Sequence, residues 1–282
     1  MSEPGRSPGE PGDTPRYIGS VHPRHSRLRN LAIGTAPVVA LLAVVGFAPL
    51  PFSVAQPGLT ANVLGDDKGT PVITIEGRPT RHTTGQLRMT TIEATGPSAE
   101  VGIADVVRAW FRTDQAVMPR DSVYPSGGSD KEITEHNQAE MKESQDSATA
   151  AALNYLHLGS KQVKVTLNLA DVGGPSAGLL FSLGIVDKLD GNGSGGELTG
   201  GRTIAGTGTI EADGSVGAVG GVSLKTRAAR RDGATVFLVP KAECSDAKAE
   251  LPGGLRLIPV TTLSGAVSAL KALDKGGSVP SC

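Results

Sequence analysis

The sequence predicts an α/β fold with mixed sheets that follows one apolar N-terminal helix. Short segments in which apolar and polar residues alternate, the pattern of half-buried strands, recur between residues 71 and 239. Segments with helical patterns lie among them, the clearest at 130–158 and 177–189. Glycine and proline are frequent, with 38 and 19 residues in a chain of 282, and they separate these segments. Strands and helices intermixed in this way favour sheets with helices packed against them.

The N-terminal segment is predicted to be a tail and a membrane anchor. Residues 1–30 are rich in proline, glycine, serine and charged residues, a composition typical of a disordered tail. The apolar run at 31–54 is long enough to span a bilayer core of about 30 Å. Arg24, Arg27 and Arg29 precede it, and such positive residues stay on the cytoplasmic side. We therefore expect a single-pass anchor, a cytoplasmic N-terminus and an extracytoplasmic remainder.

Two other interpretations of the apolar run are open. A cleaved signal peptide would use the small-residue site Ser53-Val54-Ala55, but its apolar part would exceed the usual length of about 7–15 residues. Pro49 and Pro51 are expected to end the helix near Ala48, which shortens the span. A buried helix of a soluble protein is disfavoured because the run has no polar face. We favour the uncleaved anchor.

The globular part is expected to begin near residue 58. Residues 71–76 and 87–94 alternate and are rich in β-branched side chains, so they are predicted strands. A short helix is predicted at 103–112. Its apolar side would carry Val106, Val107, Trp110 and Phe111.

The middle of the chain contains the longest predicted elements. A loop at 120–129 leads to a polar helix that starts at Ser129 or Asp130 and ends near Leu158, with a solvated charged face. A half-buried strand follows at 163–172, and an apolar helix at 177–189. The break between them is Gly173-Gly174-Pro175.

The remaining predicted elements are short. A glycine-rich loop at 190–202 precedes two strands at 204–210 and 215–219, which flank a turn at Asp213-Gly214. A helix is predicted at 222–232, with Gly233 in the position after its end, and a last strand at 235–239.

Composition excludes several classes of protein. The net charge is −1 and the basic residues form no stripe, which argues against nucleic-acid binding. The two cysteines and five histidines show no metal-ligand spacing, so no metal site is expected. No Gly-x-x-x-x-Gly-Lys-Ser/Thr motif is present, so we expect no nucleotide cofactor and no intrinsic ATPase.

Ser176 is the best candidate nucleophile. It follows a predicted strand and the turn Gly173-Gly174-Pro175, and Ala177-Gly178 opens an apolar helix behind it. Such a turn exposes the hydroxyl, and the N–H groups at the start of the helix can hold an oxyanion. The plain alternative is that Ser176 only caps the helix. Gly96-Pro97-Ser98-Ala99 repeats the tetrapeptide without a following apolar helix, so Ser98 is interpreted as a loop residue or cap.

A serine nucleophile needs a base, and Lys225 is the best candidate. No histidine lies in a patterned context, whereas a lysine can serve if its pKa falls by several units. Lys225 is expected in the first turn of a helix, where the positive helix end and the neighbouring Val222 and Leu224 disfavour the charged form. The alternative is an ordinary exposed lysine, as most lysines are.

These motifs together resemble the proteolytic domain of Lon-type peptidases. The resemblance is carried by Gly174–Gly178, by Thr-Gly-Thr-Ile at 207–210 and by Gly-Gly-Val-Ser-Leu-Lys at 220–225, and more weakly by Met-Lys-Glu-Ser at 141–144. It implies a Ser–Lys dyad of Ser176 and Lys225. It also implies that Thr207 positions the lysine and that Gly173, Gly174, Pro175, Ala177 and Gly178 support the serine. The resemblance covers about 58–275, which leaves 276–282 as a flexible C-terminus.

The chain is most similar to membrane-anchored, extracytoplasmic Lon-like proteins of bacteria, with some departures. Many of these carry a PDZ domain between the long helix and the serine strand, but only residues 155–162 separate the two here. Gly173 stands where Lon enzymes often have an acidic residue, Thr209 stands where they often have Glu, and the loop at 190–202 is longer than usual. The resemblance also raises the expectation of a hexameric homo-oligomer.

We therefore predict a serine endopeptidase that hydrolyses extracytoplasmic protein or peptide substrates. A catalytically weak binding module and a self-processing assembly module are the alternatives. Cys244 and Cys282 lie on the expected outer side, where a disulfide could persist, and the sequence leaves their pairing open.

Overall fold

The computed structural model describes residues 24–124, 129–159, 162–169 and 174–282. The chain divides into two compact units, Met1–Phe47 and Ala48–Cys282. Most of the predicted tail at 1–30 lies outside the described residues.

The described part of the first unit is one helix, α1 (Arg24–Phe47), which contains Pro37. Its described apolar side chains, such as Val39 and Leu42, are exposed within this unit. In the part of the chain that the structure describes, no helix has the length and hydropathy needed to cross a bilayer. Side chains 31, 32 and 45 of the predicted anchor lie outside that part.

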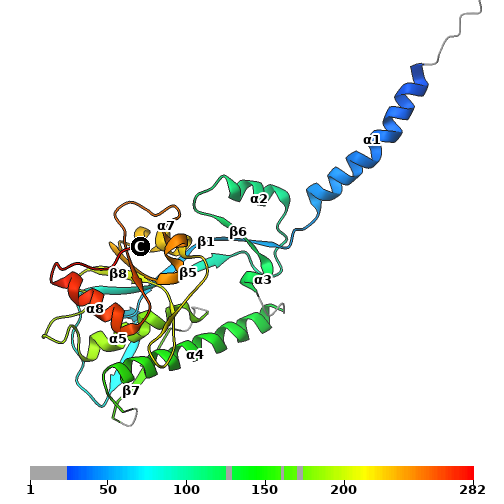
Figure 1. Ribbon diagram of the computed structural model, residues 1–282. Coiled ribbons are helices and arrows are strands. Elements are labelled where there is room, and N and C mark those ends of the chain that lie inside the picture. Colours follow the sequence, from blue (N-terminus) through cyan, green and yellow to red (C-terminus); the bar gives the residue numbers. More distant parts are fainter. Residues whose placement is uncertain (1–23, 125–128, 160–161, 170–173) are drawn as a thin grey trace, which may run out of the picture. The chain divides into compact units, whose positions relative to one another are not determined.

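The second unit is built on a six-stranded mixed sheet with the order β12-β11-β8-β5-β1-β6 (Figure 1). The four strands from β12 to β5 are parallel, and β1 runs antiparallel to both β5 and β6. The strand bounds are β1 Phe52–Asn62, β5 Gln86–Ala94, β6 Ala116–Pro119, β8 Thr203–Gly206, β11 Val236–Pro240 and β12 Arg256–Val260. The predicted mixed α/β class is confirmed.

Three two-stranded pairs accompany this sheet. They join β2 (Asp66–Asp67) with β3 (Thr70–Pro71), β4 (Ile73–Glu76) with β7 (Lys164–Leu167), and β9 (Thr209–Ile210) with β10 (Val216–Gly217). The predicted strand at 204–210 is thus two strands, β8 and β9. Thr207 and Gly208 interrupt it, and Gly208 has a φ of +151°. Residues 170–173 of the predicted strand at 163–172 and its following turn lie outside the described residues.

The helices of the second unit include the long and the apolar helices that the sequence predicts. Their bounds are α2 Ile103–Trp110, α3 Arg120–Val123, α4 Asp130–Tyr155, α5 Gly178–Leu189, α6 Val222–Arg231, α7 Cys244–Lys248 and α8 Leu263–Asp274, with 3₁₀ turns at Pro175–Ala177 and Lys241–Glu243. Ser129 caps α4 in a reciprocal arrangement with Glu132. The predicted loop at 120–129 is wrong in its first part, because residues 120–123 form α3.

The large sheet carries helices on both faces. Alternate residues along its strands point to opposite sides, as the period of two requires. Ile204 and Leu238 pack in a cluster with α5 and α8, whereas Ala205 and Phe237 pack with α6 and α7.

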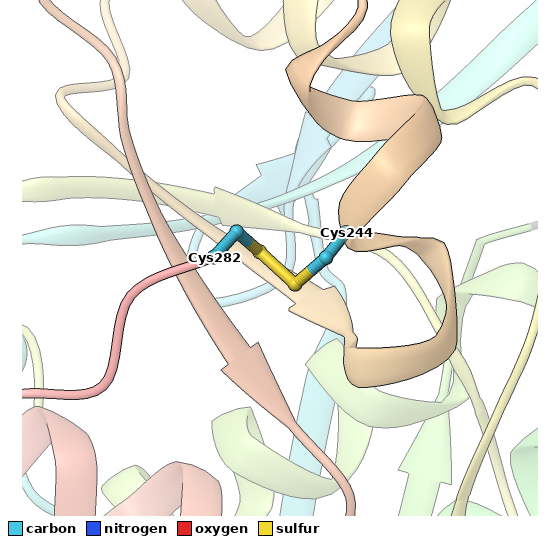
Figure 2. The surroundings of a disulfide bond; sticks show 2 residues. All are labelled: Cys244 and Cys282. Atoms are coloured by element: carbon cyan, nitrogen blue, oxygen red, sulfur yellow. A yellow bond between two sulfur atoms is a disulfide. The ribbon is translucent and has the colours of Figure 1, made fainter.

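The structure changes both boundaries of the predicted domain. Strand β1 begins at Phe52, so residues 52–54, assigned above to the anchor, form part of the sheet. At the other end, residues 276–282 contact the rest of the domain at two points, whereas the sequence predicted a flexible terminus. Val279 is 7% exposed within the core cluster, and Cys282 is joined to Cys244 by a disulfide (Figure 2).

Candidate active site

Ser176 lies in a tight turn that joins the region after β7 to α5. Gly174 has a φ of +87°, a conformation that strongly favours glycine, and a Cβ there would meet no neighbouring atom. The requirement for glycine is therefore one of backbone conformation. The 3₁₀ turn Pro175–Ala177 follows and leads directly into α5. Gly173, also predicted as a supporting residue, lies outside the described residues.

The backbone around Ser176 is fixed from two sides. Its carbonyl accepts hydrogen bonds from the Gly208 N–H at 3.0 Å and from the Thr207 hydroxyl at 3.3 Å. The Ser144 hydroxyl of α4 donates to the Pro175 carbonyl at 3.0 Å. Because these donors come from separate elements, the turn is held in one position while its serine side chain stays half-buried.

Gly178 allows α4, α5 and β9 to meet closely behind the serine. A Cβ at this position would lie 2.8 Å from Ile210 Cγ2 and 3.0 Å from Ser144 Oγ. Ala177, next to it, is buried. The Ala-Gly part of the Pro-Ser-Ala-Gly pattern is therefore explained by close packing behind the serine.

Lys225 reaches the serine turn from the other helical layer. It lies on α6, its side chain is only 4% exposed, and its Nζ donates a hydrogen bond of 3.2 Å to Thr207 Oγ1. The same threonine hydroxyl donates to the Ser176 carbonyl. Thr207 directly follows β8, so it joins the lysine of one layer to the serine turn of the other.

Burial lowers the pKa of Lys225 to about 8 from its ordinary value of 10.5. The carboxylates of Glu243 and Asp246 oppose this shift. Asp246 also accepts hydrogen bonds from the Val222 and Ser223 N–H groups, at 2.9 and 3.3 Å. A carboxylate thus caps the α6 N-terminus, so the helix end contributes less to the low pKa than the sequence suggested. Desolvation is the dominant cause.

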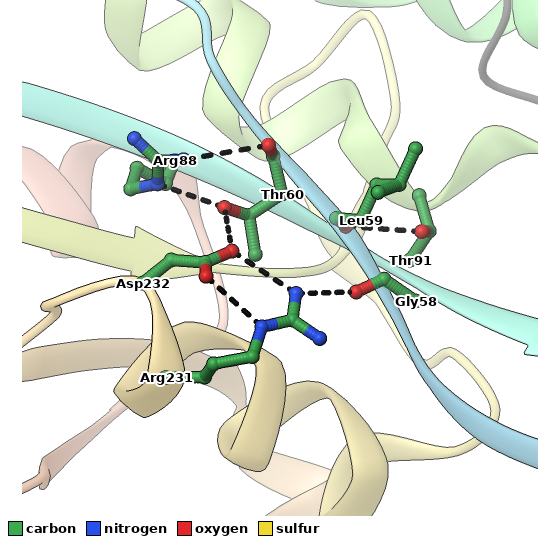
Figure 3. A network of polar contacts seen from close by, with 7 residues as sticks. All are labelled: Gly58, Leu59, Thr60, Arg88, Thr91, Arg231 and Asp232. Atoms are coloured by element: carbon green, nitrogen blue, oxygen red, sulfur yellow. Dashed lines mark hydrogen bonds and ion pairs between the residues drawn. The ribbon is translucent and has the colours of Figure 1, made fainter.

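The C-terminal end of α6 is fastened to an irregular part of β1 (Figure 3). The pairing of β1 with β5 shifts register just before Thr60. Asp232, directly after α6, accepts a hydrogen bond of 2.8 Å from the Thr60 hydroxyl, and Arg231 donates to the Gly58 carbonyl at 2.8 Å. These contacts fix the helix that carries the lysine relative to the sheet.

Ser176 and Lys225 line one cavity of about 450 Å³. Its other walls combine apolar and polar residues from β1, β5, β6, α3, α4 and the segment before α6, and Asn137 and Glu140 of α4 are among the polar ones. The apolar ones include Leu59, Ile92, Met118, Val123 and Val219. Among the described residues, no hydrogen-bond partner of the Ser176 hydroxyl is found. The sequence predicted Ser176 and Lys225 as a pair, but it did not predict the other walls, because these come from segments far apart in the chain.

The other candidate positions lie away from this cavity. The exposed Ser98 donates to Asp130 Oδ1 at 3.1 Å, as expected for a loop residue. A larger cavity of about 600 Å³, lined by α4 and β7 residues such as Met141 and Leu167, contains none of the predicted catalytic residues. The volume of this cavity alone does not indicate a catalytic function.

Comparison with known protein families identifies the second unit. The model of the Lon protease (S16) C-terminal proteolytic domain matches residues 74–270 of this chain. The match extends from β4 into α8 and therefore includes the serine turn, Thr207 and the lysine helix.

Proposed function

Because the chain belongs to the Lon protease (S16) family of serine-type endopeptidases, we propose that its catalytic groups are Ser176 as nucleophile and Lys225 as general base. One observation carries this proposal. Lys225 is buried, has a pKa of about 8 and donates to Thr207, which is itself bonded to the backbone of Ser176. A lysine in an ordinary surface position would have none of these properties.

The proposed reaction begins with neutral Lys225. One N–H of the amine stays on Thr207 Oγ1, which leaves the lone pair free for the Ser176 hydroxyl proton. Ser176 Oγ attacks the peptide carbonyl as its proton moves to Nζ. The tetrahedral intermediate then collapses, and Nζ returns the proton to the leaving amine. Lys225 Nζ then deprotonates a water molecule, which attacks the acyl-enzyme. As the second tetrahedral intermediate collapses, the bond between Ser176 Oγ and the acyl carbon breaks, Nζ returns the proton to Oγ, and the acid product leaves.

The oxyanion of this intermediate needs N–H donors in the serine turn. The Gly178 N–H donates to the Pro175 carbonyl, and the Leu179 N–H donates to the Gly208 carbonyl. Both are thus used within the protein. We therefore propose that the oxyanion is bound by N–H groups that precede Gly178 in the turn. One of them is the N–H of Ser176, the proposed nucleophile itself.

The cavity walls support cleavage of extended chain segments with an apolar side chain next to the scissile bond. Leu59, 74% exposed at the irregular part of β1, offers one apolar contact, and Met118 and Val219 offer others. A folded domain could not enter a cavity of about 450 Å³. Because the sequence has no phosphate-loop motif, we propose that the substrates are exposed or partly unfolded segments.

We further propose that α1 is an uncleaved anchor and that the peptidase lies outside the membrane. A signal-peptide cut after Ala55 would remove Phe52–Ala55, the part of β1 that pairs with β6. The Cys244–Cys282 disulfide supports an oxidising compartment. The part of the apolar run that lies within α1, residues 31–47, remains the basis for the anchor itself.

The proposed activity is tested by cleavage of casein with the wild type and a Ser176→Ala variant. We expect cleavage by the wild type alone. Intact masses of both purified proteins separate the self-processing alternative, which predicts a shortened wild type and a full-length variant. A wild type that leaves both casein and itself intact would contradict the peptidase and favour a binding module.

A further inference from the structure

Helix α2 presents an apolar face to solvent. Ile103, Val107, Trp110 and Phe111 are 40%, 50%, 80% and 83% exposed. Their spacing places all four on one side of the helix. The opposite side packs on the domain, where Ala109 is 3% exposed. We call these four residues the α2 face.

The α2 face is unusual because the apolar side of the helix faces solvent and not the core. A helix of a globular domain normally turns its apolar side to the core, and a cluster of exposed large apolar side chains marks an interaction surface. Three of these residues, Val107, Trp110 and Phe111, belong to the apolar side that the sequence predicted, whereas the predicted Val106 is half-buried. The structure leaves the α2 face without a protein partner among the described residues. An apolar partner is needed to cover it.

The chain connection places α2 close to the end of the proposed anchor. Leu50 pairs with Val101, and its N–H donates to the Val101 carbonyl at 2.8 Å. Helix α1 ends at Phe47 and α2 begins at Ile103. Two residues lie between Phe47 and Leu50, and the three Cα-to-Cα steps that join them can span about 10 Å at most. If α1 lies in a bilayer, α2 is tethered near its surface.

The charges beside the α2 face are compensated. Arg108 pairs with Asp105 at 2.9 Å, and Arg112 pairs with Asp114 at 2.8 Å. A tryptophan and a phenylalanine on a short amphipathic helix suit the boundary between lipid headgroups and acyl chains. With its neighbouring arginines paired, this surface would bind lipid through apolar contact more than through attraction to anionic headgroups.

We propose that the α2 face docks on the bilayer that holds α1. This inference rests on the proposed anchor and is independent of the peptidase chemistry. Docking would hold the domain against the membrane surface. The catalytic cavity shares β6 and α3 with this end of the domain, since Met118 and Val123 line it. Substrate segments close to the membrane would then be favoured.

Trp110 is the single tryptophan of the chain, so its fluorescence reports on the α2 face alone. The full chain is reconstituted in zwitterionic vesicles with and without lipids brominated on the acyl chain. We expect strong quenching by the brominated lipid that persists at high salt. Val107→Asp should weaken docking at least about tenfold, the equivalent of burying one valine side chain. Leu251→Asp, at an exposed apolar position elsewhere, should change nothing.

The outcomes separate the three claims. Flotation with vesicles tests the anchor, and hydrolysis of a short soluble peptide by Val107→Asp tests folding and the peptidase. Flotation without quenching overturns docking and leaves the anchor standing. Absence of both overturns both. Two other results also overturn docking and assign the α2 face to another contact. One is quenching that is unchanged in Val107→Asp. The other is a wild type that shows no quenching but forms an oligomer that Val107→Asp dissociates.

Discussion

Replacement of Lys225 with methionine should stabilise the folded protein at pH 7 while it abolishes peptidase activity. Burial lowers the pKa of Lys225 from 10.5 to about 8, so at pH 7 folding must bury a charged amine. One pKa unit corresponds to about 1.4 kcal/mol, and the cost is therefore about 3 kcal/mol. Methionine fills similar space without charge. The Thr207 hydroxyl would keep its bond to the Ser176 carbonyl.

The pH dependence of this gain distinguishes it from simple repacking. The unfolded chain keeps the ordinary pKa of Lys225, so between about pH 8 and 10.5 the unfolded state binds more protons. Wild-type stability therefore rises with pH in this window. The advantage of the variant should fall from about 3 kcal/mol at pH 7 to about 1 kcal/mol at pH 10. Urea unfolding at both pH values measures it, with exposed Lys248→Met as control. A variant that is less stable at pH 7, or equally advantaged at both values, would refute the reasoning.

Three further predictions concern the same site and the C-terminus. Because neutral Lys225 is the base, kcat/KM should rise about tenfold from pH 7 to pH 9; a flat profile would contradict this. Thr207→Val removes the acceptor for Lys225 Nζ and should lower kcat by about 10–100-fold, with Thr207→Ser restoring most of it; equal activity of both variants would argue against positioning. Cys282→Ala opens a link across 38 residues and should cost about 3–4 kcal/mol in urea unfolding, equal to the effect of reductant on the wild type; an additional effect of reductant on the variant would count against this assignment.

Local patterns predicted the elements that contain the chemistry. The alternation at 87–94, the capping signal at Ser129 and the apolar helix after Ser176 all correspond to observed elements. Each of these signals is local, and neighbouring residues reinforce it. The same holds for the glycine turn before the serine, where the φ of Gly174 requires glycine.

Elements without a clean local signal were missed. Strand β1 follows directly on the apolar run and contains Pro57, so its pattern merges with the predicted anchor. Strand β6 is only four residues long. Helix α8 was detectable, since Thr262 caps it and its buried residues recur at helical spacing from Leu263 to Leu270.

The surroundings of the dyad depend on long-range contacts that no local pattern contains. Asp246 caps the helix of Lys225 from 21 residues downstream, and its carboxylate offsets the helix-end effect. Leu59 is brought to the cavity by an irregular strand pairing. The sequence therefore predicted the candidate catalytic residues, and the structure was needed to show why the lysine has a low pKa.

The most direct test of the Ser176–Lys225 dyad is covalent labelling by a serine-reactive fluorophosphonate, followed by peptide mass mapping. At pH 8 we predict one adduct, on Ser176, in the wild type, none in Ser176→Ala and severely slowed labelling in a folded Lys225→Met variant. An adduct at another serine, or labelling of Lys225→Met at the wild-type rate, would contradict the dyad.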